Sequence, residues 1–287
     1  MVKTCDDKYL SKGGNKMKNI KKTGILALVL ALALGALTAC GGGSSEDKTI
    51  KVAASPTPHA EILEAASAAL EAEGWTLEVQ EFEDYVQPNV ATTDGDVDAN
   101  YFQHVPYLED YNAENGTDLT AVANMHYEKM AVYSETKKSL DELADGDKIG
   151  VPNDTTNEAR ALKVLADNGI ITLKEGVGSE ATKTDIVDNP KNVEIVELEA
   201  ASIPASLPDL AFGVINANYA IQADIMDKLV VAEGTDQEQE DTYVNVIVVS
   251  AENAESEKTQ ALVNALHSDE VKKFIEETYN GAVVAKF

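Results

Sequence analysis

The sequence predicts an α/β protein whose two lobes are joined by two crossing strands. From Thr49 onward, short β-type runs alternate with amphipathic helical segments, which is typical of helices layered on sheets. Two apolar segments, 119–133 and 243–250, are suited to carry the chain from one lobe to the other and back. Two strands between two lobes form a hinge, and ligands commonly bind in the cleft beside such a hinge.

The N-terminal segment has the pattern of an export signal. Lys18, Lys21 and Lys22 precede an apolar run from Ile25 to Leu34. This run is shorter than the roughly 20 apolar residues that a membrane span requires. It ends in Leu37-Thr38-Ala39-Cys40, followed at once by glycine-rich polar sequence, and this resembles the lipobox of bacterial lipoproteins.

We therefore expect residues 1–39 to be a signal peptide, of which 1–16 read as an extension from a misplaced start codon. Cys40 is expected to carry the lipid, and residues 40–48 to form a flexible tether. Without Cys5, Cys40 is the only cysteine of the exported part, so we expect no disulfide and a fold stabilised by core burial.

The charge of the chain limits its partners. The formal net charge is −27, and the part beyond the lysine-rich signal is more acidic still. Such a surface repels nucleic acid and anionic lipid head groups. We therefore expect no nucleic-acid partner, and attachment to the extracytoplasmic face of the cell membrane through the lipid alone.

The first lobe is expected to comprise residues 49–132 and 247–287, and the second lobe residues 133–246. In the first lobe, strands are predicted at 50–54, 77–82 and 97–102. Helices are predicted from Ile62 to Gly74, from about Tyr85, from about Val105 to Gly116 and, as one final helix, at 256–279. The second contains predicted strands at 148–152, around Ile171 and Val193, and at 210–216, with a helix through Arg160 to Gly169.

Arg160 is the only arginine of the chain and lies just inside the start of a predicted helix. Its flat, permanently charged guanidinium can bind both oxygens of a carboxylate, which a lysine ammonium cannot do. It is a candidate anchor for a small carboxylate. The alternative is a surface arginine paired with Glu158 or a nearby aspartate.

Polar and aromatic side chains gather at predicted strand ends, where α/β proteins place ligand sites. Segment 98–104 is one such cluster, with Tyr107 one turn further on and Tyr85 at the end of the preceding strand. Asn157 and Arg160 share one helix face. Asn216 and Asn218 would point to the same side if their strand continues. Each group alone could also be an ordinary strand end or helix cap.

The remaining histidines are expected to be structural. His59 is expected near a helix start, and His126 and His267 show no partner cluster in the sequence. No histidine, cysteine or aspartate arrangement has metal-ligand spacing, so we expect no metal and no cofactor.

A series of motifs runs in order through the exported part: Pro58-His59-Ala60-Glu61-Ile62-Leu63, Asp84-Tyr85-Val86-Gln87-Pro88-Asn89, Asp98-Ala99-Asn100-Tyr101-Phe102-Gln103-His104, Asn153-Asp154, Thr156-Asn157-Glu158, Arg160-Ala161-Leu162, Asn189-Pro190-Lys191-Asn192, Val214-Ile215-Asn216 and Asn218-Tyr219-Ala220. These motifs resemble those of the methionine-binding lipoproteins, the NlpA-type substrate-binding components of methionine ABC importers. The resemblance covers residues 49–287.

The resemblance implies a two-lobed periplasmic-binding-protein fold of type 2, which closes on a free amino acid and delivers it to a permease with a cytoplasmic ATPase. It implies that Arg160 holds the α-carboxylate with Asn157 beside it. Asn216, and less strongly Asn218, would bond the amino-acid head. The side chain would be enclosed by Tyr85, Phe102, His104 and Tyr107.

Other functions stay open at this point. A receptor of the same class could bind another amino acid or a methionine-containing dipeptide. A cleft enzyme would use His104 as general base, assisted by Tyr107 or Tyr85, but the sequence offers no recognisable nucleophile or metal, so we expect no enzyme. A surface adhesin would use the acidic face and not require Arg160.

Overall fold

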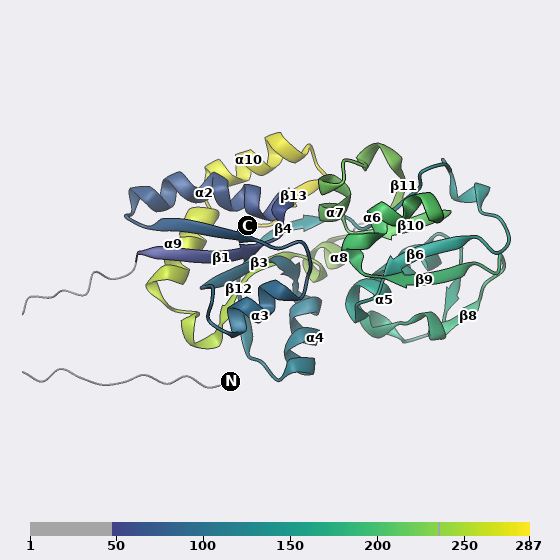
Figure 1. Cartoon of the computed structure of the whole chain (residues 1–287), viewed down its shortest axis with the longest axis horizontal. Helices are drawn as coiled ribbons and strands as arrows, with labels where there is room; N and C mark the ends of the chain where they lie inside the picture. The colour runs from purple at the N-terminus through teal and green to yellow at the C-terminus, as the bar shows by residue number, and fades with distance from the viewer. Residues whose placement is uncertain (1–47, 235) are drawn as a thin grey trace, which may run out of the picture. The chain divides into compact units, whose positions relative to one another are not determined.

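The computed structural model describes residues 48–234 and 236–287 (Figure 1). The expected signal peptide, the Cys40 lipidation site and the tether up to residue 47 lie outside these residues. Within the described part of the chain, no helix has the length and apolar character needed to cross a membrane.

A six-stranded sheet forms the centre of the first lobe. In spatial order its strands are β13 (Val283–Ala285), β4 (Leu119–Glu128), β12 (Asn245–Ser250), β3 (Ala99–His104), β1 (Thr49–Ala54) and β2 (Thr76–Glu81). The strands β1, β2 and β3 are parallel, whereas β12 runs antiparallel to both β3 and β4. The carboxyl end of β3 therefore lies beside the start of β12.

Helices cover both faces of this sheet (Figure 1). One face carries α2 (Glu61–Ala72), α9 (Glu257–Leu266) and α10 (Asp269–Tyr279), and the other carries α3 (Gln87–Thr93) and α4 (Val105–Asn115). The apolar side chains of α2 repeat at helical spacing and are fully buried against the sheet: Ile62, Leu63, Ala66 and Leu70.

A five-stranded sheet forms the centre of the second lobe. Its order is β11 (Leu229–Ala232), β5 (Ala131–Tyr133), β10 (Phe212–Ile215), β6 (Lys148–Pro152) and β9 (Glu194–Leu198). Helix α5 (Thr155–Asp167) packs on one face, and α6 (Ile203–Ser206) and α7 (Ala217–Gln222) pack on the other. The strands β7 (Thr172–Leu173) and β8 (Ile186–Asp188) form a separate two-stranded sheet.

The remaining elements are short. They are η1 (Pro56–Ala60), η2 (Leu140–Glu142), η3 (Gly178–Glu180), η4 (Lys183–Asp185), η5 (Ala200–Ser202), η6 (Leu207–Asp209), η7 (Met226–Lys228), α8 (Gln237–Thr242) and η8 (Ala251–Asn253).

The chain passes between the two sheets twice. It leaves the six-stranded sheet after β4 and enters β5, and it returns from β11 through α8 into β12. The two passages are joined to each other, because the Glu233 N–H donates to the Met130 carbonyl at 3.0 Å. The predicted two-lobed α/β fold with two crossing strands is confirmed.

Two predicted elements are each split in two. The final helix expected at 256–279 is broken at residues 267–268, where the Ser268 hydroxyl accepts from the Val271 N–H and begins α10. The segment 119–133 is likewise two strands, because β4 ends at Glu128 and β5 begins at Ala131. Apolar periodicity alone did not reveal either break.

Gly213 on β10 is required by close packing. A Cβ at this position would lie 2.9 Å from Ile203 Cγ2 and 2.9 Å from Leu207 Cδ2. We expect Gly213→Ala to lower the free energy of unfolding by about 1–3 kcal/mol, the usual effect of overpacking a core. Urea unfolding measures this change. The control is Gly234→Ala, since no described atom lies within 4 Å of a Cβ there. Equal effects of the two replacements would contradict the packing argument.

Candidate functional site

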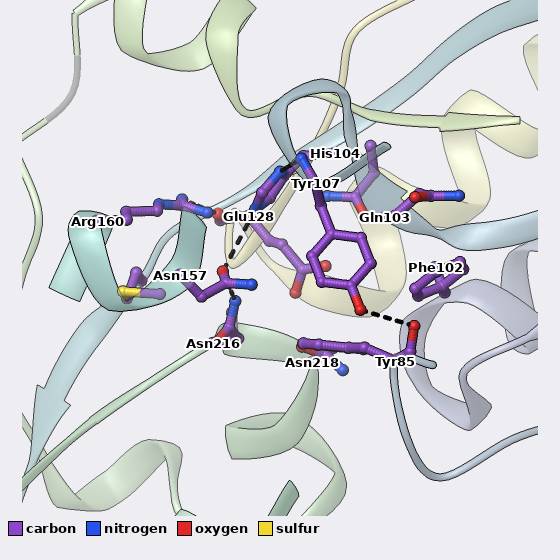
Figure 2. Close-up of a pocket in the computed structure, with 13 residues that line it drawn as sticks. Tyr85, Phe102, Gln103, His104, Tyr107, Glu128, Asn157, Arg160, Asn216 and Asn218 are labelled. Atoms are coloured by element: carbon purple, nitrogen blue, oxygen red, sulfur yellow. Dashed lines mark hydrogen bonds between the residues drawn. The ribbon is translucent and has the colours of Figure 1, made fainter. Parts of the chain in front are cut away.

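A pocket lies where the two lobes meet, and both lobes contribute to its wall (Figure 2). All eight residues predicted as ligand contacts line it: Tyr85, Phe102, His104, Tyr107, Asn157, Arg160, Asn216 and Asn218. The other lining residues are Gln103, Glu128, Met130, Ala217 and Asn245. Of these five, Glu128, Met130 and Asn245 lie at or next to the passages between the lobes, and sequence reasoning did not select any of the five as a site residue.

Arg160 is buried at one end of this pocket, with 3% of its surface exposed. The Asp154 carboxylate caps α5 by accepting from the Asn157 N–H at 3.0 Å, and Arg160 follows one turn later. Its Nε donates to Glu233 Oε2 at 3.0 Å, and its Nη2 donates to Glu233 Oε1 and to the Glu128 carbonyl. The alternative of a surface arginine paired with Glu158 or an aspartate is therefore wrong.

Glu233 is the residue that makes a buried arginine tolerable here. Its carboxylate also accepts from the Tyr127 hydroxyl at 2.7 Å, the Met130 N–H at 2.9 Å and the Gln239 amide at 2.8 Å. Burial raises the pKa of Glu233, but the Arg160 guanidinium outweighs burial and holds that pKa below its ordinary value. The carboxylate is therefore ionised at neutral pH and compensates the buried cation.

Tyr243 completes the Arg160 environment, with its ring centroid 4.1 Å from the guanidinium carbon. A guanidinium over an aromatic face is attracted by the ring quadrupole. The hydrogen bonds of Arg160 to described residues use Nε and Nη2, so the Nη1 donors remain for a ligand.

Amide side chains lie beside the arginine. Asn157 Oδ1 accepts from Asn216 Nδ2 at 2.7 Å and lies 3.3 Å from His104 Nε2. Asn216 does not continue a strand as expected, because β10 ends at Ile215 and Asn216 begins α7. The expected strand alternation of Asn216 and Asn218 is therefore wrong, yet both still face the pocket.

Two of these amides have spare hydrogen-bonding capacity. Among the described residues, Asn216 Oδ1 and Asn218 Nδ2 are buried without a partner. Asn218 Oδ1 accepts from the Tyr85 hydroxyl at 2.6 Å. Because unpaired buried polar atoms cost free energy, these two atoms are suited to bond a polar ligand.

His104 is neutral in this environment. Its Nδ1 accepts from the Tyr107 N–H at 3.2 Å, so Nε2 carries the proton that faces Asn157. Burial lowers the pKa of His104 to about 4, and the positive charge of Arg160 acts in the same direction.

Aromatic rings form the opposite end of the pocket (Figure 2). The Tyr85 ring centroid lies 5.9 Å from that of Phe102 and 6.0 Å from that of Tyr107, and Phe102 and Tyr107 are 5.8 Å apart. The Tyr107 hydroxyl donates to the Tyr85 backbone carbonyl at 3.0 Å, and the Tyr85 hydroxyl donates to Asn218 Oδ1, so each ring is held in place. This end can enclose an apolar or sulfur-containing side chain.

The expectation that His126 has no partner cluster is wrong. Its Nδ1 bonds the Tyr101 hydroxyl, its Nε2 lies 3.1 Å from Glu128 Oε1, and its ring centroid is 5.0 Å from that of His59. His59 lies at a helix start as expected, with Nε2 at 3.0 Å from Asn245 Oδ1. The cluster joins η1 to β4, which are far apart in the sequence, so sequence spacing could not reveal it.

The cluster also corrects the expectation about metal-ligand geometry. Within the described residues, the ligand atoms of His59, His126 and Glu128 all lie within 4.8 Å of one another, a grouping that could hold a metal ion. Burial lowers the pKa of His59 to about 4, helped by the neighbouring His126. His59 is therefore neutral at pH 7.

Comparisons with known proteins agree with this geometry. The family described as "NlpA lipoprotein" matches residues 50–287. The D-methionine-binding lipoprotein MetQ of Escherichia coli K12 is 41% identical over 255 residues, which cover 87% of this chain and 92% of that protein. A lipoprotein structure from Ruminococcus gnavus is 57% identical, with a TM-score of 0.81 over 84% of this chain and 100% of its own. A nutrient-binding protein from Burkholderia cenocepacia, solved bound to methionine, is 40% identical with a TM-score of 0.79, and the match covers 83% of this chain and 100% of that chain.

The buried pair of Arg160 and Glu233 yields a prediction about stability. We expect Glu233→Ala to lower the free energy of unfolding by about 3–5 kcal/mol, because it leaves a buried guanidinium without a counter-charge. Urea unfolding measures the loss. The matched control is Asp167→Ala, which removes a pair with Lys163 whose side chains are each 54% exposed. That control should cost less than about 1 kcal/mol, and similar losses for both variants would show that the buried pair is not special.

The two neutral histidines predict how stability depends on pH. His59 and His104 have folded pKa values of about 4, below the ordinary 6.5. Between these values the unfolded chain binds protons that the folded chain does not, so their contribution is complete above pH 6.5 and is lost as pH falls toward 4.

Unfolding curves measured between pH 7.5 and 4 test this dependence. We expect His104→Gln to reduce the slope of unfolding free energy against pH by up to about 1.4 kcal/mol per pH unit, the value for one proton. Because the slopes of the variant and the wild type are compared, a loss of stability that is equal at every pH does not change the result. Parallel curves would show that His104 is protonated in the folded chain.

Proposed function

The chain belongs to the NlpA lipoprotein family, and we propose that it is a lipid-anchored receptor that binds L-methionine in its interlobe pocket. Its relatives are methionine-binding lipoproteins, and one structure of the same fold contains methionine. We propose further that the receptor delivers the amino acid to the permease of an ABC importer, as the family resemblance implies.

The observation that carries this proposal is the asymmetry of the pocket. One end holds the buried Arg160 guanidinium with amide groups beside it, and the other end is formed by the rings of Tyr85, Phe102 and Tyr107. A free amino acid with a long uncharged side chain has the same asymmetry. The α-carboxylate would bond Arg160 and Asn157, and the side chain would lie against the aromatic rings.

The energies show why both ends are needed. A charge-assisted hydrogen bond contributes roughly 1.5–3 kcal/mol net, and a thioether against an aromatic edge adds about 0.3–1.5 kcal/mol. A micromolar ligand requires about 8 kcal/mol. The remainder must come from burial of the ligand as the lobes enclose it, and a ligand that contacts both lobes favours the closed arrangement.

The pocket favours binding over catalysis. A general base works best when its pKa is near the operating pH. The pKa of His104 is about 4, so this residue is a weak base at neutral pH. The relatives are also named as binding proteins.

The lipoprotein family supports a position at the membrane. We propose that acylated Cys40 holds the receptor on the extracytoplasmic face of the membrane, and that residues 40–48 let it reach its permease. Because the chain is negatively charged, anionic head groups repel it, and the lipid on Cys40 must hold it at the membrane.

Calorimetry on protein that was unfolded and refolded to remove carried-over ligand tests the proposal. We expect L-methionine to bind to the wild type, and Arg160→Lys to weaken binding by about 30-fold or more, because a lysine cannot reproduce the guanidinium fork. The matched control is Lys163→Ala, since Lys163 lies on the same helix but is exposed and outside the pocket. Lys163→Ala should bind as the wild type does. Heat with another amino acid or a methionine-containing dipeptide, and none with methionine, would overturn the proposed ligand.

A further inference from the structure

Glu128 is a buried carboxylate that neither the sequence analysis nor the proposed function uses. It is the last residue of β4, only 6% exposed, and its side chain lines the pocket (Figure 2). Oε1 lies 3.1 Å from His126 Nε2. Oε2 is buried and has no hydrogen-bond partner among the described residues. A buried carboxylate oxygen without a hydrogen bond lowers the stability of the protein unless a ligand donates a hydrogen bond to it.

The local hydrogen bonds hold Glu128 in place. Tyr101 bonds His126 Nδ1, and His126 Nε2 faces Glu128 Oε1. This chain is satisfied when the Tyr101 hydroxyl donates to Nδ1 and the His126 N–H donates to Oε1. All three side chains are buried, so the carboxylate is fixed before any ligand arrives.

The charges of the pocket favour a cationic ligand group at this oxygen. Arg160 and Glu233 form a pair of opposite charges, and neutral His59 and His104 add no charge. Burial raises the pKa of Glu128, but the hydrogen bond from His126 and the charge of Arg160 oppose burial, and that pKa stays below its ordinary value. Oε2 of this carboxylate has no hydrogen-bond partner among the described residues, and the guanidinium of Arg160 is already paired with Glu233.

We propose that Glu128 Oε2 accepts a hydrogen bond from the α-ammonium group of the bound amino acid. The inference rests on the proposed function and extends it, because it assigns the second charge of the zwitterion to a residue. Arg160 would bind the negative end and Glu128 the positive end. Both residues line the same pocket, and the Arg160 Nη2 donates to the Glu128 backbone carbonyl at 3.0 Å, so they are neighbours in its wall.

A metal ion is the other occupant that this cluster could take, through His59, His126 and Glu128. The hydrogen bonds argue against it. Both nitrogens of His126 and Nε2 of His59 already have partners within the protein. The unpaired carboxylate oxygen belongs to a residue of the pocket wall, where an amino acid would lie.

The test compares two ligands on two proteins. Calorimetry on the full chain, stripped of ligand, would use L-methionine and its des-amino analogue, which has hydrogen in place of the ammonium group. For the wild type we expect the analogue to bind about 30-fold or more weakly, as when one partner of a buried charge pair is removed. In Glu128→Gln the difference between the two ligands should shrink to less than about tenfold, because the ammonium group has lost its counter-charge.

Glu233→Gln is the matched control. It also converts a buried carboxylate to an amide, but this carboxylate pairs with Arg160. We therefore expect it to weaken both ligands alike. Thermal unfolding of each variant shows whether the fold is kept.

Several results would overturn the inference. Equal affinity of the wild type for L-methionine and its des-amino analogue would overturn it. A ratio of the two affinities in Glu128→Gln that equals the wild-type ratio would also overturn it. One equivalent of zinc found by elemental analysis and lost in His59→Ala would assign the cluster to a metal instead. If the wild type binds no amino acid, the proposed function itself fails, whereas methionine binding with an unchanged difference removes only the role of Glu128.

Discussion

The buried ion pair of Arg160 and Glu233 is the constraint on which the pocket depends. A guanidinium that is 3% exposed needs a counter-charge, and Glu233 supplies it through two parallel hydrogen bonds. The same carboxylate bonds the backbone of Met130 in the other passage between the lobes. One residue therefore positions the anchoring arginine and joins the two segments that connect the lobes.

The rest of the site follows from where this pair lies. Arg160 lies on α5 of the second lobe, whereas Phe102 and His104 lie at the carboxyl end of β3 in the first lobe. The pocket is polar toward the second lobe and aromatic toward the first. A ligand with one charged end and one apolar end fits both walls at once.

Much of the fold and of the pocket could be predicted because local patterns determine them. Alternating strands and amphipathic helices indicated the α/β lobes. Polar and aromatic residues at strand ends and on the Arg160 helix, together with the family resemblance, indicated eight of the pocket residues. Glu128 and Glu233 could not be found in this way. Glu128 ends β4 and Glu233 directly follows β11, and the contacts that bring each of them to Arg160 join residues distant in sequence.

One error comes from long-range contacts, and the others come from local breaks in strands and helices. Glu128 is only two residues from His126, but the other members of the cluster, Tyr101 and His59, reach His126 from distant parts of the sequence. The break in the final helix depended on a single serine cap, which apolar periodicity does not report. The end of β10 before Asn216 turned an expected strand into a helix start, although the side chains still reached the pocket.

The placement of the two carboxylates has a mechanical consequence. Glu128 begins the first passage between the lobes and Glu233 follows β11 at the start of the second, so both carboxylates lie where the lobes are joined rather than out on the lobe faces. A force exerted on them acts on a very short lever arm, and a small displacement at the pivot becomes a large movement at the far rims. A rotation of one lobe against the other about this point would move the two carboxylates little and the outer rims of the lobes far.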